Sequence, residues 1–144
     1  MPAIQANGLS LEYESFGDPA DPAILLVMGL GMQMILWPDA LCQMLTAQGF
    51  RVVRFDNRDA GLSTQIDHLG TPRVGLETLK YLVRLPMKAP YLIGDMARDT
   101  AALLDELGIA RAHVVGASMG GMIAQNLAAD FPAKVLTLTS IMST

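Results

Sequence analysis

Short apolar runs alternate along the chain with stretches in which apolar residues recur at helical spacing. Ala23–Val27 is apolar throughout and has the length of a strand, and Arg51–Phe55 and Val135–Ile141 are further strand candidates. Helical periodicity marks residues 36–48 and 93–107. Apolar strands that alternate with helices are typical of a parallel sheet that helices cover on both faces. The pattern therefore predicts an α/β fold with a mostly parallel sheet.

The N-terminal residues follow a different pattern. Asn7-Gly8 lies between two short strand candidates, residues 3–6 and 10–16. Asn-Gly is a strong signal for the tight turn of a β-hairpin. We therefore expect a hairpin to precede the alternating strands and helices.

Proline and glycine mark where the helix at 36–48 begins and ends. Pro38 would lie in its first turn, where proline is tolerated, and Gly49 follows its last residue. The single cysteine, Cys42, cannot form an internal disulfide. Its apolar neighbours Leu41 and Met44 predict that Cys42 faces the core from this helix.

Residues 64–92 are the least regular part of the chain, with three prolines and a short apolar stretch at 79–85. The segment leaves from the carboxyl end of the strand Arg51–Phe55. Ligands bind at that edge in open α/β sheets. The segment could wall a pocket or form a solvated surface loop, and the sequence leaves both alternatives open.

Composition indicates a globular protein. Hydrophobic residues make up 51% of the chain and charged residues 17%, and no apolar run reaches the ~18 residues of a membrane span. Residues 1–5 lack the basic and apolar regions of a signal peptide. The formal net charge of −4 and the lack of a basic cluster argue against a nucleic-acid partner. We therefore expect a cytoplasmic protein that binds neither nucleic acid nor membranes.

A Gly-x-Ser-x-Gly pattern occurs at 116–120, with Ser118 at its centre. A strand candidate at 113–117 leads into it, and the helix candidate Met119–Asp130 follows. A serine on such a turn takes a strained backbone conformation and projects its hydroxyl outward, as a nucleophile requires. Strand and helix come close at Gly116 and Gly120, where a Cβ would clash. We therefore predict that Ser118 is a nucleophile, against the alternative of a chance match to a short motif.

Two backbone N–H groups could bind the oxyanion of an acyl-transfer reaction. The N–H of Met119 begins a helix and has no acceptor within it, so it can donate with the help of the helix dipole. Met28-Gly29-Leu30-Gly31 follows the apolar strand Ala23–Val27, and its glycines let the backbone approach a ligand closely. Alone, this segment could be an ordinary glycine turn. The strand-to-helix turn that carries Ser118 is called the elbow below. Together with the elbow, the glycine segment makes the N–H of Leu30 the expected second donor.

These motifs resemble those of the α/β-hydrolase fold superfamily, in which a His-Gly loop follows the third strand and Gly-x-Ser-x-Gly follows the fifth. Met28 stands here in place of the usual histidine. Residues 55–63 are similar to the family's Asp-x-Arg-Gly-x-Gly-x-Ser segment, although Asp59-Ala60 departs from the commoner Gly-x. The run Gly-Leu-Gly-Met-Gln, together with Asn-Arg-Asp-Ala-Gly, is most similar to the branch that contains aclacinomycin methylesterase and related ester hydrolases. The resemblance covers essentially all 144 residues. Because Ser118 occupies the elbow, an aspartate nucleophile is excluded.

A serine nucleophile needs a base and a carboxylate that orients the base. The resemblance implies the chain order serine, acid, histidine. Asp130 is the only acid after Ser118, and no histidine follows. Asp130 would lie roughly 18 Å along the following helix and is expected to face solvent. We therefore expect residues 1–144 to be the N-terminal portion of a single α/β-hydrolase domain, with the last strands, lid, acid and histidine in an absent C-terminal half.

Both histidines of the chain precede Ser118. His113 begins the strand that leads to the elbow, about 16 Å from the serine at the wrong edge of the sheet, and is expected to be structural. His68 lies in the segment that leaves from the correct edge and is the better candidate base, although loop histidines are more often exposed than catalytic. Asp56 and Asp59 lie near the same edge, and the resemblance implies that they brace loops.

The combined prediction is a serine hydrolase that forms an acyl-serine from a small apolar carboxylic ester, with no metal and no organic cofactor. Cleavage of amides or carbon–carbon bonds and cofactor-free perhydrolysis use the same constellation and stay open. Met28, Met32 and Met34 could line an adaptable apolar pocket or fill the core.

The alternative prediction belongs to a different class of function. Val135–Ile141 is apolar, uncharged and free of proline. An exposed edge strand of this kind tends to pair with another chain. The chain would then be a catalytically incomplete fragment that forms a homo-oligomer through this strand or pairs with a complementing C-terminal half.

Overall fold

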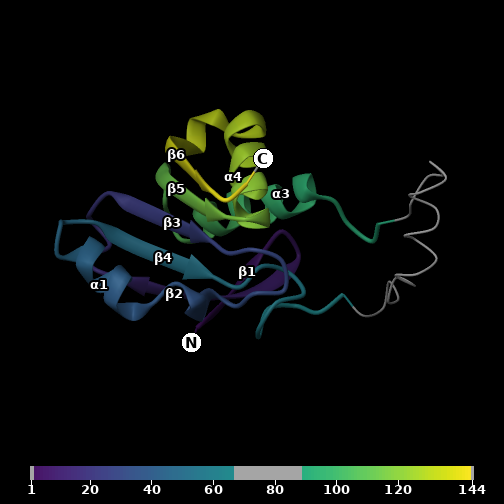
Figure 1. Cartoon of the computed structure of the whole chain (residues 1–144), viewed down its shortest axis with the longest axis horizontal. Helices are drawn as coiled ribbons and strands as arrows, with labels where there is room; N and C mark the ends of the chain where they lie inside the picture. Colours follow the sequence, from purple (N-terminus) through teal and green to yellow (C-terminus); the bar gives the residue numbers. More distant parts are fainter. Residues whose placement is uncertain (1, 67–88, 144) are drawn as a thin grey trace.

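A computed structural model describes residues 2–66 and 89–143. The described part forms one six-stranded sheet in the order β1-β2-β4-β3-β5-β6 (Figure 1). Its elements, in chain order, are β1 (Ala3–Ala6), β2 (Leu9–Phe16), β3 (Ala23–Val27), the 3-10 turn η1 (Met34–Leu36), α1 (Asp39–Thr46), β4 (Arg51–Phe55), α3 (Ile93–Glu106), β5 (Ala112–Ala117), α4 (Met119–Asp130), the 3-10 turn η3 (Pro132–Lys134) and β6 (Val135–Ile141).

The four strands β4, β3, β5 and β6 are parallel, which confirms the predicted α/β class. The hairpin of β1 and β2 extends the sheet on the other side, because β2 pairs antiparallel with β4. Asn7 and Gly8 both have positive φ, 50° and 77°. The two central residues of a type I′ hairpin turn need positive φ, so the Asn-Gly signal has its expected structural basis.

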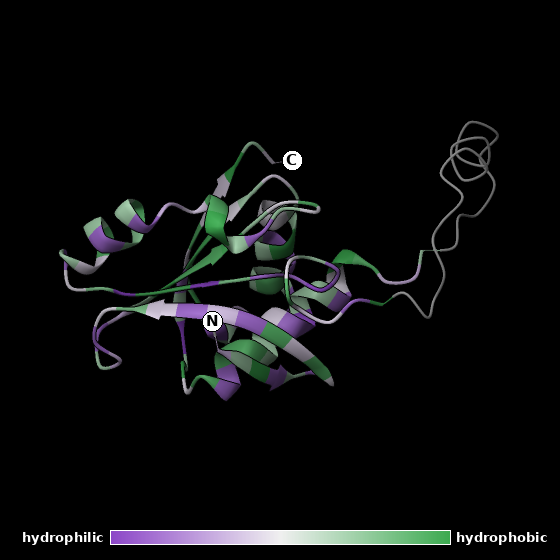
Figure 2. Ribbon diagram, turned by 90° about the horizontal axis from the view of Figure 1, so that it is seen from below, coloured by the Kyte–Doolittle hydropathy of each residue, from purple (hydrophilic) through white to green (hydrophobic). Residues whose placement is uncertain are grey.

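Two hydrophobic cores lie on opposite faces of the sheet. Successive side chains of a strand point to opposite faces. Leu25 and Val27 therefore pack with α3 and α4, whereas Ile24 and Leu26 pack on the side of α1. The helices carry both hydrophobic and hydrophilic residues along their length, as amphipathic helices do (Figure 2). Cys42 is fully buried in the second core, as its neighbours predicted.

A helix within residues 36–48 is confirmed, but its predicted start at residue 36 is wrong. A separate 3-10 turn ends at Leu36, and α1 begins only at Asp39 with Pro38 as its N-cap. The reason is local, because a residue that precedes proline is driven out of the helical region. Trp37 accordingly has φ −80° and ψ 105°, and Pro38 has φ −63° and ψ 144°, both extended.

Two sequence predictions concern residues outside the described ranges. His68 and the apolar stretch at 79–85 both lie among residues 67–88. Of the irregular segment 64–92, only its two ends belong to the described part. Among the helices that the structure describes, none has the length and apolar character needed to cross a membrane.

Candidate active site

Ser118 occupies the turn between β5 and α4. Its backbone has φ 54° and ψ −124°, a combination that side-chain-bearing residues rarely adopt. The side chain is exposed and does not cap the helix that begins at Met119. The Ser118 N–H donates to the carbonyl of Ile141 at 2.8 Å, which anchors the turn to the end of β6. The hydroxyl is thus presented to solvent on a turn whose backbone is held.

Glycine is required on both sides of Ser118. A Cβ on Gly116 would lie 2.2 Å from the carbonyl oxygen of Gly120. A Cβ on Gly120 would lie 2.2 Å from the carbonyl oxygen of Val27, at the end of β3. These are backbone atoms that cannot move aside easily. The crowding at Gly120 therefore comes from the neighbouring strand β3 and not from β5, which the sequence alone did not indicate.

The glycine loop after β3 lies directly against the elbow. A Cβ on Gly29 would be 3.2 Å from the Ser118 Cβ and 3.6 Å from its Oγ. Gly29 accepts a hydrogen bond from the Met32 N–H at 3.3 Å, which closes a turn over residues 29–32. Within the described residues, the N–H of Leu30 makes no hydrogen bond, and the Leu30 side chain is 73% exposed. The loop therefore presents a free donor next to the serine.

An apolar cavity of about 290 Å³ opens beside Ser118. The methionines divide between the two roles that the sequence left open, because Met28 and Met32 line the cavity whereas Met34 is fully buried in the interior. Trp37 forms a further part of the wall, and the buried guanidinium of Arg54 donates to its carbonyl oxygen. The remaining lining residues are Gly29, Leu36, Ala117, Ile141 and Met142.

The cavity wall includes three residues that the sequence did not indicate, namely Trp37, Ile141 and Met142. Trp37 is the single tryptophan of the chain and follows the glycine loop closely, which is the only signal that could have found it. Ile141 and Met142 lie at the carboxyl end of β6, which pairs with β5 next to the elbow. Their place in the cavity wall depends on the order of the strands, which local sequence patterns do not predict.

Two acidic residues near this edge hold loops. The Asp56 carboxylate accepts the N–H groups of Met34 at 2.6 Å and Leu62 at 3.3 Å. Asp59 accepts the N–H of Ile66 at 2.6 Å. Burial, and then a hydrogen bond to Asp59, raise the pKa of Tyr91 to about 12. Both carboxylates therefore have structural partners, in agreement with the bracing role that the resemblance implied.

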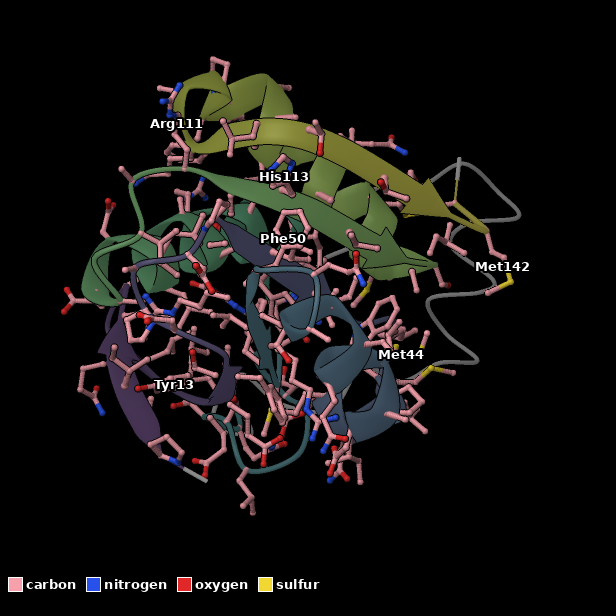
Figure 3. The ribbon with its side chains drawn as sticks, turned by 90° about the vertical axis from the view of Figure 1, so that its left-hand side faces the viewer. Tyr13, Met44, Phe50, Arg111, His113 and Met142 are labelled. Carbon is pink, nitrogen blue, oxygen red and sulfur yellow. The ribbon has the colours of Figure 1, made fainter. Side chains whose placement is uncertain are left out.

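The remaining candidate groups lie away from the serine. His113 is hydrogen-bonded through Nδ1 to Thr137 Oγ1 at 2.8 Å and meets the Phe50 ring edge-on. Figure 3 shows His113 near Phe50 and away from Met142, which lines the cavity. Asp130 is exposed at the last residue of α4. Burial raises the pKa of the Cys42 thiol, so this cysteine is not a competing nucleophile.

A family model that describes the alpha/beta hydrolase fold matches residues 22–144, which include the elbow, the glycine loop and the strands that carry them. This chain belongs to the α/β-hydrolase fold family. Within the family it is 36% identical over 139 residues to rhodomycin D methylesterase DnrP of Streptomyces peucetius, covering 96% of this chain and 41% of that protein. The predicted resemblance to a methylesterase branch is thereby confirmed.

Two further similar proteins are named for other activities. A putative carbamate hydrolase, RutD of Variovorax paradoxus, is 33% identical, covering 92% of this chain and 42% of that protein. The crystal structure of the enol-lactonase from Burkholderia xenovorans LB400 superposes with a TM-score of 0.71 and 30% identity, covering 93% of this chain and 44% of that one. The chain spans about two fifths of the length of the curated relatives it matches.

Proposed function

We propose that this chain carries the nucleophile and the oxyanion hole of a serine hydrolase that cleaves a small apolar carboxylic ester. The observation that carries the proposal is the contact between two loops. The strained Ser118 elbow and the Gly29 loop touch at the mouth of an apolar cavity. A nucleophile, a free N–H donor and a site for an apolar group thus meet at one edge of the sheet.

In the proposed reaction, Ser118 Oγ attacks the ester carbonyl carbon while a base takes the hydroxyl proton. The carbonyl oxygen becomes an oxyanion, which the N–H groups of Leu30 and Met119 bind. Collapse of this intermediate breaks the bond to the alcohol oxygen, which leaves with the proton that the base had taken. Water then attacks the acyl-serine, and the carboxylic acid is released with Ser118 regenerated.

The base and its carboxylate belong to the proposal as well. We assign them to the part of the fold that the relatives have and these 144 residues do not span, so that residues 1–144 form the N-terminal portion of a single domain. The relatives are named as a methylesterase, a putative carbamate hydrolase and an enol-lactonase. All three names describe attack on a carbonyl that bears a heteroatom leaving group, which supports an ester substrate. The apolar cavity beside Ser118 supports a small apolar portion of that ester.

The Leu30 donor can be removed without changing the turn. Leu30 is the second residue of the turn 29–32, a position that favours proline, and proline lacks the N–H. Leu30→Pro should lower the rate constant for p-nitrophenolate release from p-nitrophenyl acetate, measured in the first turnover, by about 10²–10³-fold. Leu30→Ala keeps the N–H and should lose far less. Ser118→Ala sets the background, and release that persists in this variant would refute the proposal.

A second candidate function rests on β6. This strand lies at the margin of the sheet, and the described side chains of Leu136, Leu138 and Ile141 are each about two fifths exposed (Figure 1). An unpaired apolar edge favours association with another chain. The chain would then act as a self-associating half-domain without turnover of its own.

A further inference from the structure

The glycine loop connects β3 to η1 and comprises residues 28–33. Two buried polar side chains from the loop after β4 hold this connection, one at its first residue and one at Met34, which follows its last residue. Asn57 Nδ2 donates to the carbonyl of Met28 at 2.9 Å, at the start of the loop. The Asp56 carboxylate accepts the N–H of Met34 at 2.6 Å, at its end. Both Asn57 and Asp56 are only 3% exposed. They therefore act inside the protein, behind the face that the loop presents to the cavity.

These bonds determine how the peptide groups of the loop are oriented. In a planar trans peptide the C=O and the N–H point in opposite directions. Asn57 fixes the peptide between Met28 and Gly29 through the Met28 carbonyl. The next peptide is fixed because the Gly29 carbonyl accepts the N–H of Met32 at 3.3 Å. The Leu30 N–H belongs to this second peptide, so its direction follows from the same two contacts.

The loop needs such support because its own residues are permissive. Gly31 has a φ of 65°, which a type II turn requires at this position, and glycine also populates many other conformations. The exposed Leu30 side chain contributes no packing that would select one conformation. Gly61 leaves space for the Asp56 carboxylate, because a Cβ at this position would lie 1.9 Å from Asp56 Oδ2.

We infer that Asn57 and Asp56 are positioning residues that aim the Leu30 N–H at the oxyanion. This inference rests on the proposed function, in which that N–H is a donor. Neither side chain touches the substrate. Asn57 acts through the Met28 carbonyl, and Asp56 keeps the far end of the loop in place. For this segment the resemblance implied only that Asp56 and Asp59 brace loops. The inference adds Asn57 and connects the bracing to the direction of the Leu30 N–H.

A double-mutant cycle tests the inference. Asn57→Leu removes the donor to Met28 and should lower the first-turnover rate constant for p-nitrophenyl acetate by about 10²-fold, with KM changed by less than about threefold. In the Leu30→Pro background the donor is already absent. Asn57→Leu should then cost less than about threefold more, because both changes remove one interaction. Asn57→His, which can offer an N–H at a similar position, should recover part of the rate.

Controls keep the outcomes distinct. Leu62→Ala alters an exposed side chain of the same loop and keeps the N–H that Asp56 accepts, so its rate should match that of the unaltered protein. Folding is checked by circular dichroism and Trp37 fluorescence. If Asn57→Leu is unfolded, Asn57→Ser takes its place in the cycle.

The outcomes of the cycle test the positioning role of Asn57 and the Leu30 donor separately. Equal losses from the Asn57 change in both backgrounds would overturn the positioning role and leave the proposed function intact. No loss in Leu30→Pro itself would overturn the Leu30 donor, and with it both the proposed oxyanion hole and this inference. Strong coupling between the two sites, with KM unchanged, is the expected result.

Discussion

Ser118 holds backbone angles, φ 54° and ψ −124°, that are almost exclusive to glycine. Strain of this kind typically costs about 1–3 kcal/mol and persists only where the surroundings enforce it. Here the enforcing contacts are the hydrogen bond from the Ser118 N–H to Ile141 and the close approach of Gly120 to Val27. The same angles project the hydroxyl away from the helix. At the scale of the residue, exposure of the proposed nucleophile and loss of stability have one cause.

Replacing Ser118 should therefore separate strain from chemistry. Ser118→Gly relieves the strain of about 1–3 kcal/mol, against about 0.4–1 kcal/mol of added entropy in the unfolded chain. We expect it to unfold at higher urea, with a free energy of unfolding about 1 kcal/mol above that of Ser118→Ala, which keeps a Cβ. Both variants should be inactive. Equal stability of the two variants would show that the elbow is not strained.

Asp99 connects three elements of the fold. From α3 it pairs with Arg58 in the loop after β4, at 2.6 Å and 2.7 Å, and accepts a hydrogen bond from Asn7 of the hairpin at 2.7 Å. The two charged side chains are 10% and 3% exposed. Arg58 also lies over the ring of Tyr91, 5.0 Å from its centroid. The loop that holds Asn57 and Asp56 is thus fastened to the rest of the molecule through a buried ion pair.

Breaking this pair should destabilise the fold strongly. Asp99→Asn leaves the Arg58 charge buried without its counter-charge, which typically costs about 3–5 kcal/mol. Asp105→Asn provides the matched control, because Asp105 is 65% exposed and its pair with Lys134 is open to solvent. That change should cost no more than about 1 kcal/mol in urea unfolding. Similar losses in the two variants would argue against a special role for the buried pair.

Elements with strong local signals were predictable, and those decided by neighbours were not. The strands, the Asn7-Gly8 turn and the glycines around Ser118 follow from periodicity and from steric rules within a few residues. The start of α1 was missed because the effect of Pro38 on Trp37 outweighed the apolar periodicity that continued through it. Such boundaries depend on one backbone contact, which the periodicity of side chains does not record.

At the scale of the whole molecule, the strand order determines what the sequence could not predict. β5 lies between β3 and β6, so the elbow meets the Gly29 loop on one side and Ile141 with Met142 on the other. The cavity therefore draws on three strand ends that are far apart in the chain. The class of fold and the turn that presents Ser118 could be predicted from motifs, whereas most of the cavity wall and the Asn57 contact required the tertiary arrangement.

The same strand order leaves β6 at the margin, and we expect the described edge to mediate self-association. Light scattering over a range of concentrations should give a molar mass above that of one chain. Thr139 is exposed on β6, and Thr139→Lys places a charge where an approaching strand would pair. This variant should raise the dissociation constant at least about tenfold. Gln43→Lys adds the same charge at an exposed position of α1 and should leave the molar mass of the assembly unchanged. A monomer at every concentration in the unaltered protein would contradict association through β6, and it would favour the hydrolase proposal over the self-associating half-domain.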